Sequence, residues 1–410
     1  MKAGSRGERT DVRSHTCGGS RPKVVIIGAG PAGLMVATQL KETNAEITLV
    51  DQKSAPGRKF LVAGHGGFNL THSEPLEAFV AKYDSEFIRQ CVRVFSPEDT
   101  REWLSGIGIG TIVGSSGKIF PTEDTKPIEV LNAWLQTLES PGITGVFKTT
   151  FVNFSEKEVE VLTDGETSYL PYDYLVFATG GASWKKTGSD GKWTAAFREK
   201  KIALKPFGAS NSGLETVHGH WLEKYEGAIV KNVRFTVGET VFAGDFTVTE
   251  YGIEGKPVYA VNNWLRNHEM KGLFIDFKPQ LSFEQILKTI KAAKNMREGF
   301  LDLKLSGAIY QWFREELTKE EFTDPETMSR LLKAFQPQIE GFRPIDEVIS
   351  TVGGVAMDAI DETGRLSGYE NIYCCGEMLD WDAPTGGYLL QGCFSSGYVV
   401  GSNLRLILKA

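Results

Sequence analysis

The chain is poor in cysteine and lacks a long apolar run, and each shortage excludes a class of protein. Its 410 residues include five cysteines, an odd set without the spacing of a disulfide framework or a zinc site. No stretch approaches the roughly 18 apolar residues of a membrane span, and the mean hydropathy is −0.19. These features predict a cytoplasmic globular protein without a membrane partner or a bound metal.

Positive charge is also in deficit, because 45 Lys and Arg face 52 Asp and Glu, which gives a formal net charge of −7. Such a balance argues against broad binding to nucleic-acid phosphates and favours a small-molecule substrate, although a local basic patch stays open. Residues 1–22 carry cations among Gly and Ser with no apolar region after them, so we interpret them as a disordered extension rather than a secretory signal. Nothing in the composition indicates an oligomeric state.

The run from Val24 to Gly33 predicts a buried parallel strand, a tight turn and the start of a helix. In this G-x-G-x-x-G pattern Gly28 permits the turn, Gly30 allows a pyrophosphate to approach the backbone, and Gly33 allows close packing of helix on strand. Pro31 fits the first helical turn, because its missing N–H would have no partner there. The unpaired N–H groups of that turn and the helix dipole attract phosphate.

Asp51 closes the next predicted strand, about 20 residues after the glycines, where a carboxylate accepts hydrogen bonds from ribose hydroxyls. A lone glycine motif is weak evidence. The two strands, the helix and the acid together indicate a dinucleotide site.

Later segments favour FAD over NAD as that dinucleotide. A buried strand at 174–177 leads to Gly180 and Gly181, a second returns at 371–377, and a helix opened by Gly386 and Gly387 runs to the C-terminus. The returning strand and the helix that follows it would contact the isoalloxazine, far from the adenylate. No second G-x-G-x-x-G that would hold NAD(P)H is visible, so this donor would bind transiently.

The order of these segments predicts an α/β fold, in which both chain ends build a Rossmann-like FAD-binding domain around an insertion. The expected boundaries are a disordered extension at 1–22, a first FAD-binding segment at 23–190, an inserted β-barrel-like part at 191–280, an inserted helical part at 281–344 and a second FAD-binding segment at 345–410.

From residue 23 onward the chain resembles the BaiN-type family of NAD(P)/FAD-dependent oxidoreductases, within the glutathione-reductase-like flavoproteins. The resemblance is carried by blocks in a fixed order: Gly28 to Gly33, Gly57 to Leu61, Gly64 to Asn69, Phe120-Pro121, Ala178 to Gly181, Thr351 to Val355, Gly376 to Asp380 and Gly386 to Tyr388.

The resemblance implies contacts along the whole cofactor. Asp51 would bind the adenosine ribose, Arg58 and Lys59 would lie near the phosphates or ribityl chain, and Glu377 near the ribityl hydroxyls. The full set of expected cofactor contacts is Gly28, Gly30, Pro31, Ala32, Gly33, Asp51, Gln52, Arg58, Lys59, Phe60, Thr179, Gly180, Gly181, Gly376, Glu377, Gly386, Gly387, Tyr388 and Leu389.

The chain departs from the commoner family pattern at several positions. His65 and Phe68 stand where many members have other residues in the Gly64 to Asn69 block, Leu389 replaces a frequent Asn, and a block at 249–255 is altered. We interpret the chain as a distinct subfamily whose substrate does not follow from its relatives.

The candidates for catalysis are His65 and Tyr388. A histidine with a pKa of about 6.5 exchanges protons near neutral pH, and a tyrosine beside the flavin could stack on it or donate a proton. A backbone-bonded histidine and a packing tyrosine are the equal alternatives. Tyr251 and Glu254 are further candidates to face the substrate.

Cys374 and Cys375 are expected to be buried structural residues, since neighbours on a strand point to opposite faces. The Cys-x2-Cys and Cys-x4-Cys patterns of flavin-linked disulfides are absent, which argues against disulfide reductase activity.

We therefore expect an FAD-dependent oxidoreductase in which NAD(P)H or another donor reduces the flavin, and a small organic acceptor such as a conjugated enone is reduced in turn. Two alternatives stay open: a flavin-dependent tRNA-modifying enzyme and a non-enzymatic FAD-binding redox sensor.

Overall fold

The computed structural model describes residues 21–62, 68–122, 124–217 and 219–409. His65 and residues 1–20 of the predicted extension lie outside these ranges. Within them, no helix combines the length and the apolar character needed to cross a membrane.

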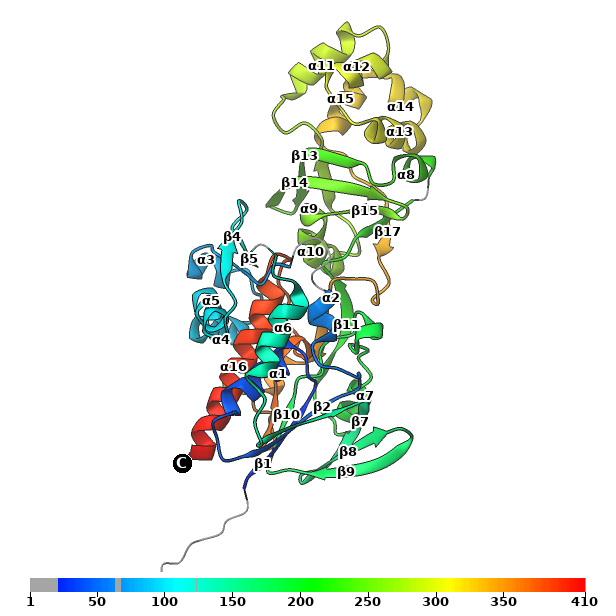
Figure 1. Ribbon diagram of the computed structural model, residues 1–410. Coiled ribbons are helices and arrows are strands. Elements are labelled where there is room, and N and C mark those ends of the chain that lie inside the picture. The colour runs from blue at the N-terminus through cyan, green and yellow to red at the C-terminus, as the bar shows by residue number, and fades with distance from the viewer. Residues whose placement is uncertain (1–20, 63–67, 123, 218, 410) are drawn as a thin grey trace, which may run out of the picture.

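A five-stranded parallel sheet lies at the centre of the body, in the lower half of Figure 1. Val24 to Ile27 in its middle strand are at most 3% exposed, so this strand is buried on both faces, as its run of β-branched residues predicts. The strand order is β19 (Ile372–Cys374), β10 (Tyr174–Phe177), β1 (Lys23–Ile27), β2 (Glu46–Asp51) and β6 (Ile143–Phe147).

Two different layers cover this sheet. Helices α1 (Pro31–Leu40), α6 (Pro127–Gln136) and α16 (Tyr388–Lys409) bury one face in a shared apolar core. The other face packs against α7 (Thr194–Glu199) and the meander of β7 (Thr149–Phe154), β8 (Glu158–Thr163) and β9 (Glu166–Pro171). Helix α16 packs closely against α1 at Gly397. A Cβ at this position would stand 2.4 Å from the carbonyl oxygen of Ala32, so the approach requires glycine.

The segment between β2 and β6 adds small elements at the side of the body. These are α2 (Arg58–Val62), α3 (Leu76–Val80), α4 (Glu86–Val94), α5 (Pro97–Gly106) and a sheet of β3 (Thr71–His72), β5 (Lys118–Pro121) and β4 (Thr111–Val113). The sequence predicts a loop over 106–117, whereas Thr111–Val113 forms a strand paired with β5.

The inserted part stands above the body in Figure 1, with the helices of residues 283–333 at the far tip. Its sheet has the order β16 (Leu273–Asp276), β13 (Ile229–Val237), β14 (Thr240–Thr249), β15 (Gly252–Glu254), β12 (Leu214–Thr216) and β17 (Ile339–Phe342). Its helices are α8 (His220–Tyr225), α9 (Lys256–Ala260), α10 (Asn262–Asn267), α11 (Phe283–Ala292), α12 (Met296–Asp302), α13 (Gly307–Glu316), α14 (Lys319–Thr323) and α15 (Pro325–Lys333).

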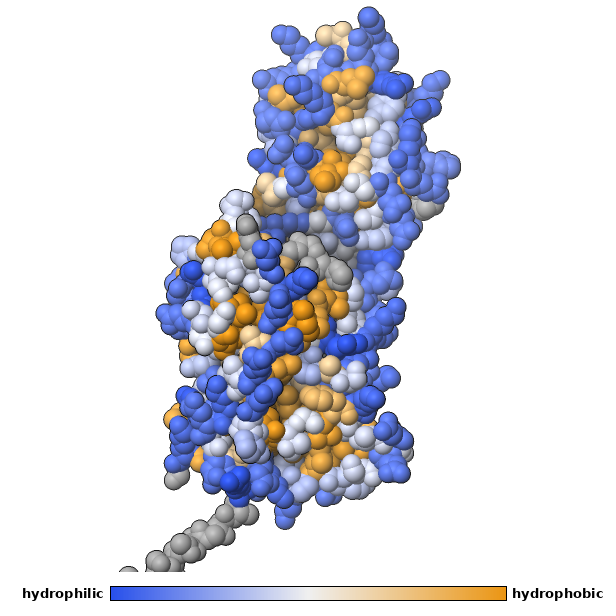
Figure 2. Space-filling view, viewed as in Figure 1, coloured by the Kyte–Doolittle hydropathy of each residue, from blue (hydrophilic) through white to orange (hydrophobic). Residues whose placement is uncertain are grey.

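This arrangement confirms the predicted fold class, a Rossmann-like domain made from both chain ends and interrupted by a β-rich and a helical part. The domain boundaries themselves stay a prediction. In Figure 2, hydrophilic side chains follow the edges of the molecule and much of the tip, while apolar patches lie over the helical face of the body.

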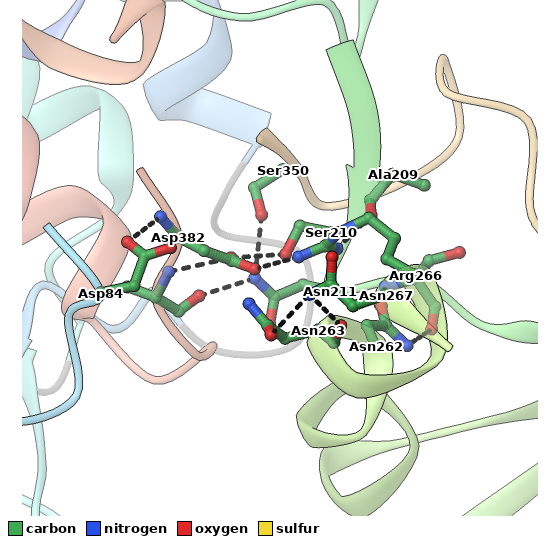
Figure 3. Close-up of polar contacts among 12 residues, drawn as sticks. Asp84, Ala209, Ser210, Asn211, Asn262, Asn263, Arg266, Asn267, Ser350 and Asp382 are labelled. Carbon is green, nitrogen blue, oxygen red and sulfur yellow. Dashed lines mark hydrogen bonds and ion pairs between the residues drawn. The ribbon is translucent and has the colours of Figure 1, made fainter. Parts of the chain in front are cut away.

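The insertion joins the body through two antiparallel strands and a polar cluster. The strands are β11 (Leu204–Ser210) and β18 (Ser350–Val355). In the cluster Arg266 of α10 donates to Asp382 at 2.6 Å, and the Ser210 hydroxyl donates to the other oxygen of that carboxylate at 2.6 Å (Figure 3). These contacts fix the insertion against the segment that leads into α16.

Candidate functional site

The turn between β1 and α1 is built by glycines whose roles differ. Gly28 has a φ of +106°, and a Cβ there would stand 2.2 Å from the carbonyl oxygen of Ala178. A Cβ at Gly33 would stand 1.9 Å from the Gly28 carbonyl oxygen, whereas the same atom at Gly30 would meet nothing within 4 Å. Gly28 and Gly33 therefore allow tight packing, and Gly30 faces open space.

Helix α1 begins without a side-chain cap. Gly30 is its N-cap and makes no side-chain hydrogen bond, Pro31 occupies the first turn, and the first turn contains no acidic residue. The N–H groups of this turn have no partner within the helix itself. With a partial charge of about +0.5 at the helix start, they form a phosphate-binding end.

Asp51 lies beside this turn and accepts two backbone hydrogen bonds. Its Oδ2 accepts from the N–H of Ala29 at 2.9 Å and its Oδ1 from the N–H of Lys53 at 2.8 Å. Burial raises the pKa of this carboxyl, and the two backbone N–H groups oppose the rise. Each carboxylate oxygen can accept a further hydrogen bond, so Asp51 can also receive ribose hydroxyls.

An open cleft runs across the carboxyl edge of the sheet. It contains the largest part of the predicted cofactor set: Gly28, Gly30, Pro31, Ala32, Asp51, Gln52, Arg58, Lys59, Thr179, Gly180, Gly376 and Glu377. Residues widely separated in the sequence thus line one cleft.

One end of the cleft is polar. The sequence predicted Gln52 and Gly180 as part of it, but not Ser189. Gln52 donates to the Gly188 carbonyl oxygen at 2.5 Å, and the indole of Trp193 donates to the Gly180 carbonyl oxygen at 3.0 Å. Ser189 lines this end and is 5% exposed, yet its hydroxyl has no hydrogen-bond partner in the described part of the chain. Its sequence context, Thr-Gly-Ser-Asp, gave no signal for this role.

The open space at Gly30 and the unpartnered Ser189 hydroxyl fit a bound dinucleotide. A buried hydroxyl without a partner costs about 1–3 kcal/mol, and a ligand with polar groups in the cleft would remove that cost. The adenylate half of FAD would supply ribose and adenine groups at this end, and its pyrophosphate would suit the start of α1.

Lys59 and Glu377 form an ion pair across the other end of the cleft. Lys59 Nζ lies 2.6 Å from Glu377 Oε2 and donates to Ser183 Oγ at 2.9 Å. The N–H of Thr351 donates to the second oxygen of Glu377 at 3.3 Å. Lys59 is therefore already neutralised, and Arg58, which forms no ion pair with the described residues, is the cleft-lining cation left for phosphate.

Cys393 on α16 also lines this end, which the sequence did not suggest. Burial, with the charge of Glu377, raises the pKa of its thiol to about 12, although Lys59 acts in the opposite direction. The thiol is therefore protonated at neutral pH. Cys374 and Cys375 are buried, as expected for structural residues.

Helix α16 starts directly after Gly386 and Gly387. Tyr388, its first residue, is 6% exposed and stacks on Phe79 with ring centroids 4.5 Å apart. Its hydroxyl donates to Glu74. Burial raises the pKa of the phenol, and the Glu74 carboxylate raises it further. Tyr388 does not line the cleft, so its proposed catalytic role stays a prediction.

Some predicted contacts lie beside the cleft rather than in its lining. Phe60 is 2% exposed and packs on Phe68 with centroids 4.8 Å apart. Gly181 backs onto Thr351, whose Oγ1 would be 2.1 Å from a Cβ there. The further members outside the described lining are Gly33, Gly386, Gly387 and Leu389.

The two candidates in the insertion contact each other. Tyr251 donates to Glu254 Oε2 at 2.7 Å, and Arg343 lies over the tyrosine ring at 4.0 Å from its centroid. Neither of the two residues lines the cleft. His65 lies outside the described residues.

The chain matches the family model described as HI0933-like protein Rossmann domain over residues 22–403. It is 27% identical over 409 residues to the 3-dehydro-bile acid delta(4,6)-reductase of Clostridium scindens, covering 92% of this chain and 98% of the relative. It is 22% identical over 395 residues to the ribosomal RNA dihydrouridine synthase of Escherichia coli, covering 93% and 97%.

Solved structures share the fold at lower identity. The 3-ketosteroid-delta4-(5alpha)-dehydrogenase of Rhodococcus jostii RHA1 has a TM-score of 0.52 and 15% identity, with 96% of this chain and 99% of that chain covered. A flavocytochrome c3 fumarate reductase in its open conformation has a TM-score of 0.54 and 12% identity, with 96% and 80% covered. The family model spans most of the chain and confirms the expected resemblance: the chain belongs to the HI0933-like protein Rossmann domain family and is a flavoprotein oxidoreductase that uses FAD.

Proposed function

We propose that this chain is an NAD(P)H-linked reductase of a small conjugated enone. Bound FAD supplies the hydride chemistry, and the protein supplies binding, orientation and electrostatics. The observation that carries the proposal is the single cleft that joins the start of α1, Asp51 and the Lys59–Glu377 pair, because an extended dinucleotide needs contacts at all three places.

Each part of the cleft has a task in this proposal. The first turn of α1 and Arg58 hold the pyrophosphate, Asp51 holds the adenosine ribose, and Glu377 receives ribityl hydroxyls. The N-terminus of α16, after Gly387, would offer its dipole to negative charge on the flavin ring.

The acceptor class is supported by the reductase from Clostridium scindens, which matches this chain along nearly its whole length, insertion included. Reduction of an enone adds a hydride to one carbon and a proton to its neighbour. The departures at Leu389 and 249–255 leave the particular enone open.

Anaerobic stopped-flow spectroscopy of the purified holoprotein tests the proposal. NADH or NADPH should bleach the flavin band, and a conjugated enone, but not its saturated ketone, should restore it. A flavin that neither nucleotide reduces would remove the nucleotide-linked branch. Reduced protein that no enone reoxidises would remove the acceptor.

A second candidate is a flavin-dependent enzyme that modifies RNA. It is favoured by the two ribosomal RNA dihydrouridine synthases among the relatives, at 22% and 25% identity, while the net charge of −7 weighs against it. RNA that copurifies with the protein and is released by salt would support this candidate. A flavin inert to every donor would instead favour the redox sensor.

A further inference from the structure

Two neighbouring side chains near the start of α16 have buried polar atoms without partners. Both polar atoms of the Asn69 amide are buried and form no hydrogen bond with the residues that the structure describes, and the same holds for the hydroxyl of Thr71, a residue that is 0% exposed. Each unsatisfied buried group costs about 1–3 kcal/mol. Because two such residues lie within three positions of each other, we interpret the unsatisfied groups as contacts for a ligand.

The backbone of this segment is firmly held. Leu70 donates its N–H to Ile119 at 2.8 Å, and Thr71 pairs with Ile119 in the β3–β5 ladder. Phe68 packs edge-to-face on Phe60 of α2, at a centroid distance of 4.8 Å. The unpartnered groups are therefore preorganised rather than free to turn towards solvent.

The segment directly contacts the residue that precedes α16. A Cβ at Gly387 would stand 2.5 Å from Thr71 Cα, and Gly387 has a φ of +99°. No side chain other than glycine leaves room here, so Thr71 and the N-terminus of α16 form one surface.

Two helices that carry this surface or pack on it also carry residues of the cofactor cleft. Cys393 lines the cleft, and Tyr388 begins the same helix five residues earlier, which at 1.5 Å per residue is about 8 Å along the axis. On the other side, α2 carries Lys59 in the cleft and Phe60 against Phe68. Helices α2 and α16 thus connect the Lys59–Glu377 end of the cleft with the surface of Asn69 and Thr71.

We propose that Asn69 and Thr71 hydrogen-bond the pyrimidine edge of the flavin ring. That edge presents an acceptor, a donor and an acceptor in order: C2=O, N3–H and C4=O. The Asn69 amide offers one acceptor beside one donor group, and the Thr71 hydroxyl offers a further donor. The inference rests on FAD as the cofactor and is independent of the donor and the acceptor substrate.

The variant Asn69→Leu tests this assignment, because leucine is close in size and has no polar atom. Without FAD, the variant should melt at or above the wild-type temperature, since two buried unsatisfied groups are gone. With FAD, it should bind the cofactor about tenfold more weakly, equivalent to the loss of about 1.4 kcal/mol. Its flavin absorption band should shift, and its reduction potential should become more negative.

A matched control separates ligand binding from the stability that is gained when a buried unsatisfied hydroxyl is removed. Thr216 in the insertion is 2% exposed, and its hydroxyl also has no partner among the described residues. Thr216→Val should raise stability without FAD but leave FAD affinity and spectrum unchanged, whereas Thr71→Val should weaken FAD binding. N3-methyl-FAD, which lacks the N3–H donor, should bind less tightly than FAD to wild type and about equally to the Asn69→Leu variant.

Unchanged FAD affinity and an unchanged flavin spectrum in both Asn69→Leu and Thr71→Val would overturn the proposal. Loss of enone reduction with both FAD readouts as expected would instead count against the proposed function alone. The two failures are therefore distinguishable.

Discussion

Lys59 Nζ lies 2.6 Å from Glu377 Oε2, and this pair joins two segments 318 residues apart in the sequence across the cofactor cleft. Both side chains are largely buried, with exposed fractions of 27% and 14%. The removal of one partner from such a pair leaves a buried charge without compensation. The ion pair thus ties the N-terminal and C-terminal halves of the FAD domain together.

Lys59→Met should lower the free energy of unfolding by about 3 kcal/mol and weaken FAD binding. The double variant Lys59→Met with Glu377→Gln should recover part of the stability, because no unpaired charge remains. Urea unfolding of both variants measures the coupling. Lys291→Met, which breaks an exposed ion pair with Glu326, is the matched control and should cost less than about 1 kcal/mol.

Asp51→Asn should weaken FAD binding more than tenfold. Both carboxylate oxygens accept backbone N–H groups, and an amide would turn its NH2 towards one of these donors. Titration of flavin-free protein with FAD measures the effect. Asp173→Asn serves as control, since Asp173 also accepts a backbone N–H, from Lys23 at 2.7 Å, but at the opposite end of β1. Equal affinities for the two variants would exclude Asp51 from the site.

The affinity for FAD should also decrease as the pH is lowered, because Asp51 becomes protonated. Burial raises the pKa of this carboxyl, and only its charged form accepts ribose hydroxyls with both oxygens. The decline on acidification should be missing in Asp51→Asn.

Tyr388→Phe separates a catalytic role from a packing role. The phenol donates to Glu74 and the ring stacks on Phe79, so we expect a loss of about 1 kcal/mol in stability and rates of flavin reduction and reoxidation within threefold of wild type. A general acid typically contributes about 10²–10⁴-fold. A reoxidation rate reduced by two orders of magnitude at unchanged stability would make Tyr388 the proton donor.

Asp84 should make stability depend on pH. Burial, opposed by the N–H of Asp382 and reinforced by the charges of Asp382 and Asp380, raises its pKa from 3.8 to about 6. Because water reaches this exposed side chain, the contribution of the shift to stability is smaller than it would be in the core. Because folding favours the protonated form, this contribution is complete below pH 3.8 and is lost as the pH rises through about 6.

Asp84→Asn keeps an acceptor for the N–H of Asp382, which lies 2.7 Å from the carboxylate (Figure 3). Relative to wild type, it should gain stability between pH 4 and pH 7 and then stay constant. Urea midpoints across this range provide the measurement. Parallel pH profiles for the two proteins would show that Asp84 keeps its ordinary pKa in the folded state.

The sequence predicted the local backbone features of the cleft at β1, α1 and β2 because local chemistry determines them. The glycine spacing at Gly28 to Gly33 and the acid at Asp51 specify a turn, a helix start and a strand end, each within a few residues. The order of later glycine segments also predicted a split domain. Both follow from backbone geometry, which sequence patterns describe directly.

Other features depend on tertiary contacts that no local pattern encodes. The partner of Lys59 is a carboxylate 318 residues away, and Ser189 and Cys393 enter the cleft only through the packing of distant elements. Phe60 and Tyr388 are buried among aromatic residues instead of lining the cleft. Apolar side chains next to a motif are as readily used by the core as by a ligand.

The most direct test of the account is an anaerobic titration of the purified holoprotein, followed by its visible absorption spectrum. We predict a flavin band, its bleaching by one equivalent of NADH or NADPH, and its return on addition of a conjugated enone. A protein that binds no flavin when purified or reconstituted with FAD would contradict the central claim.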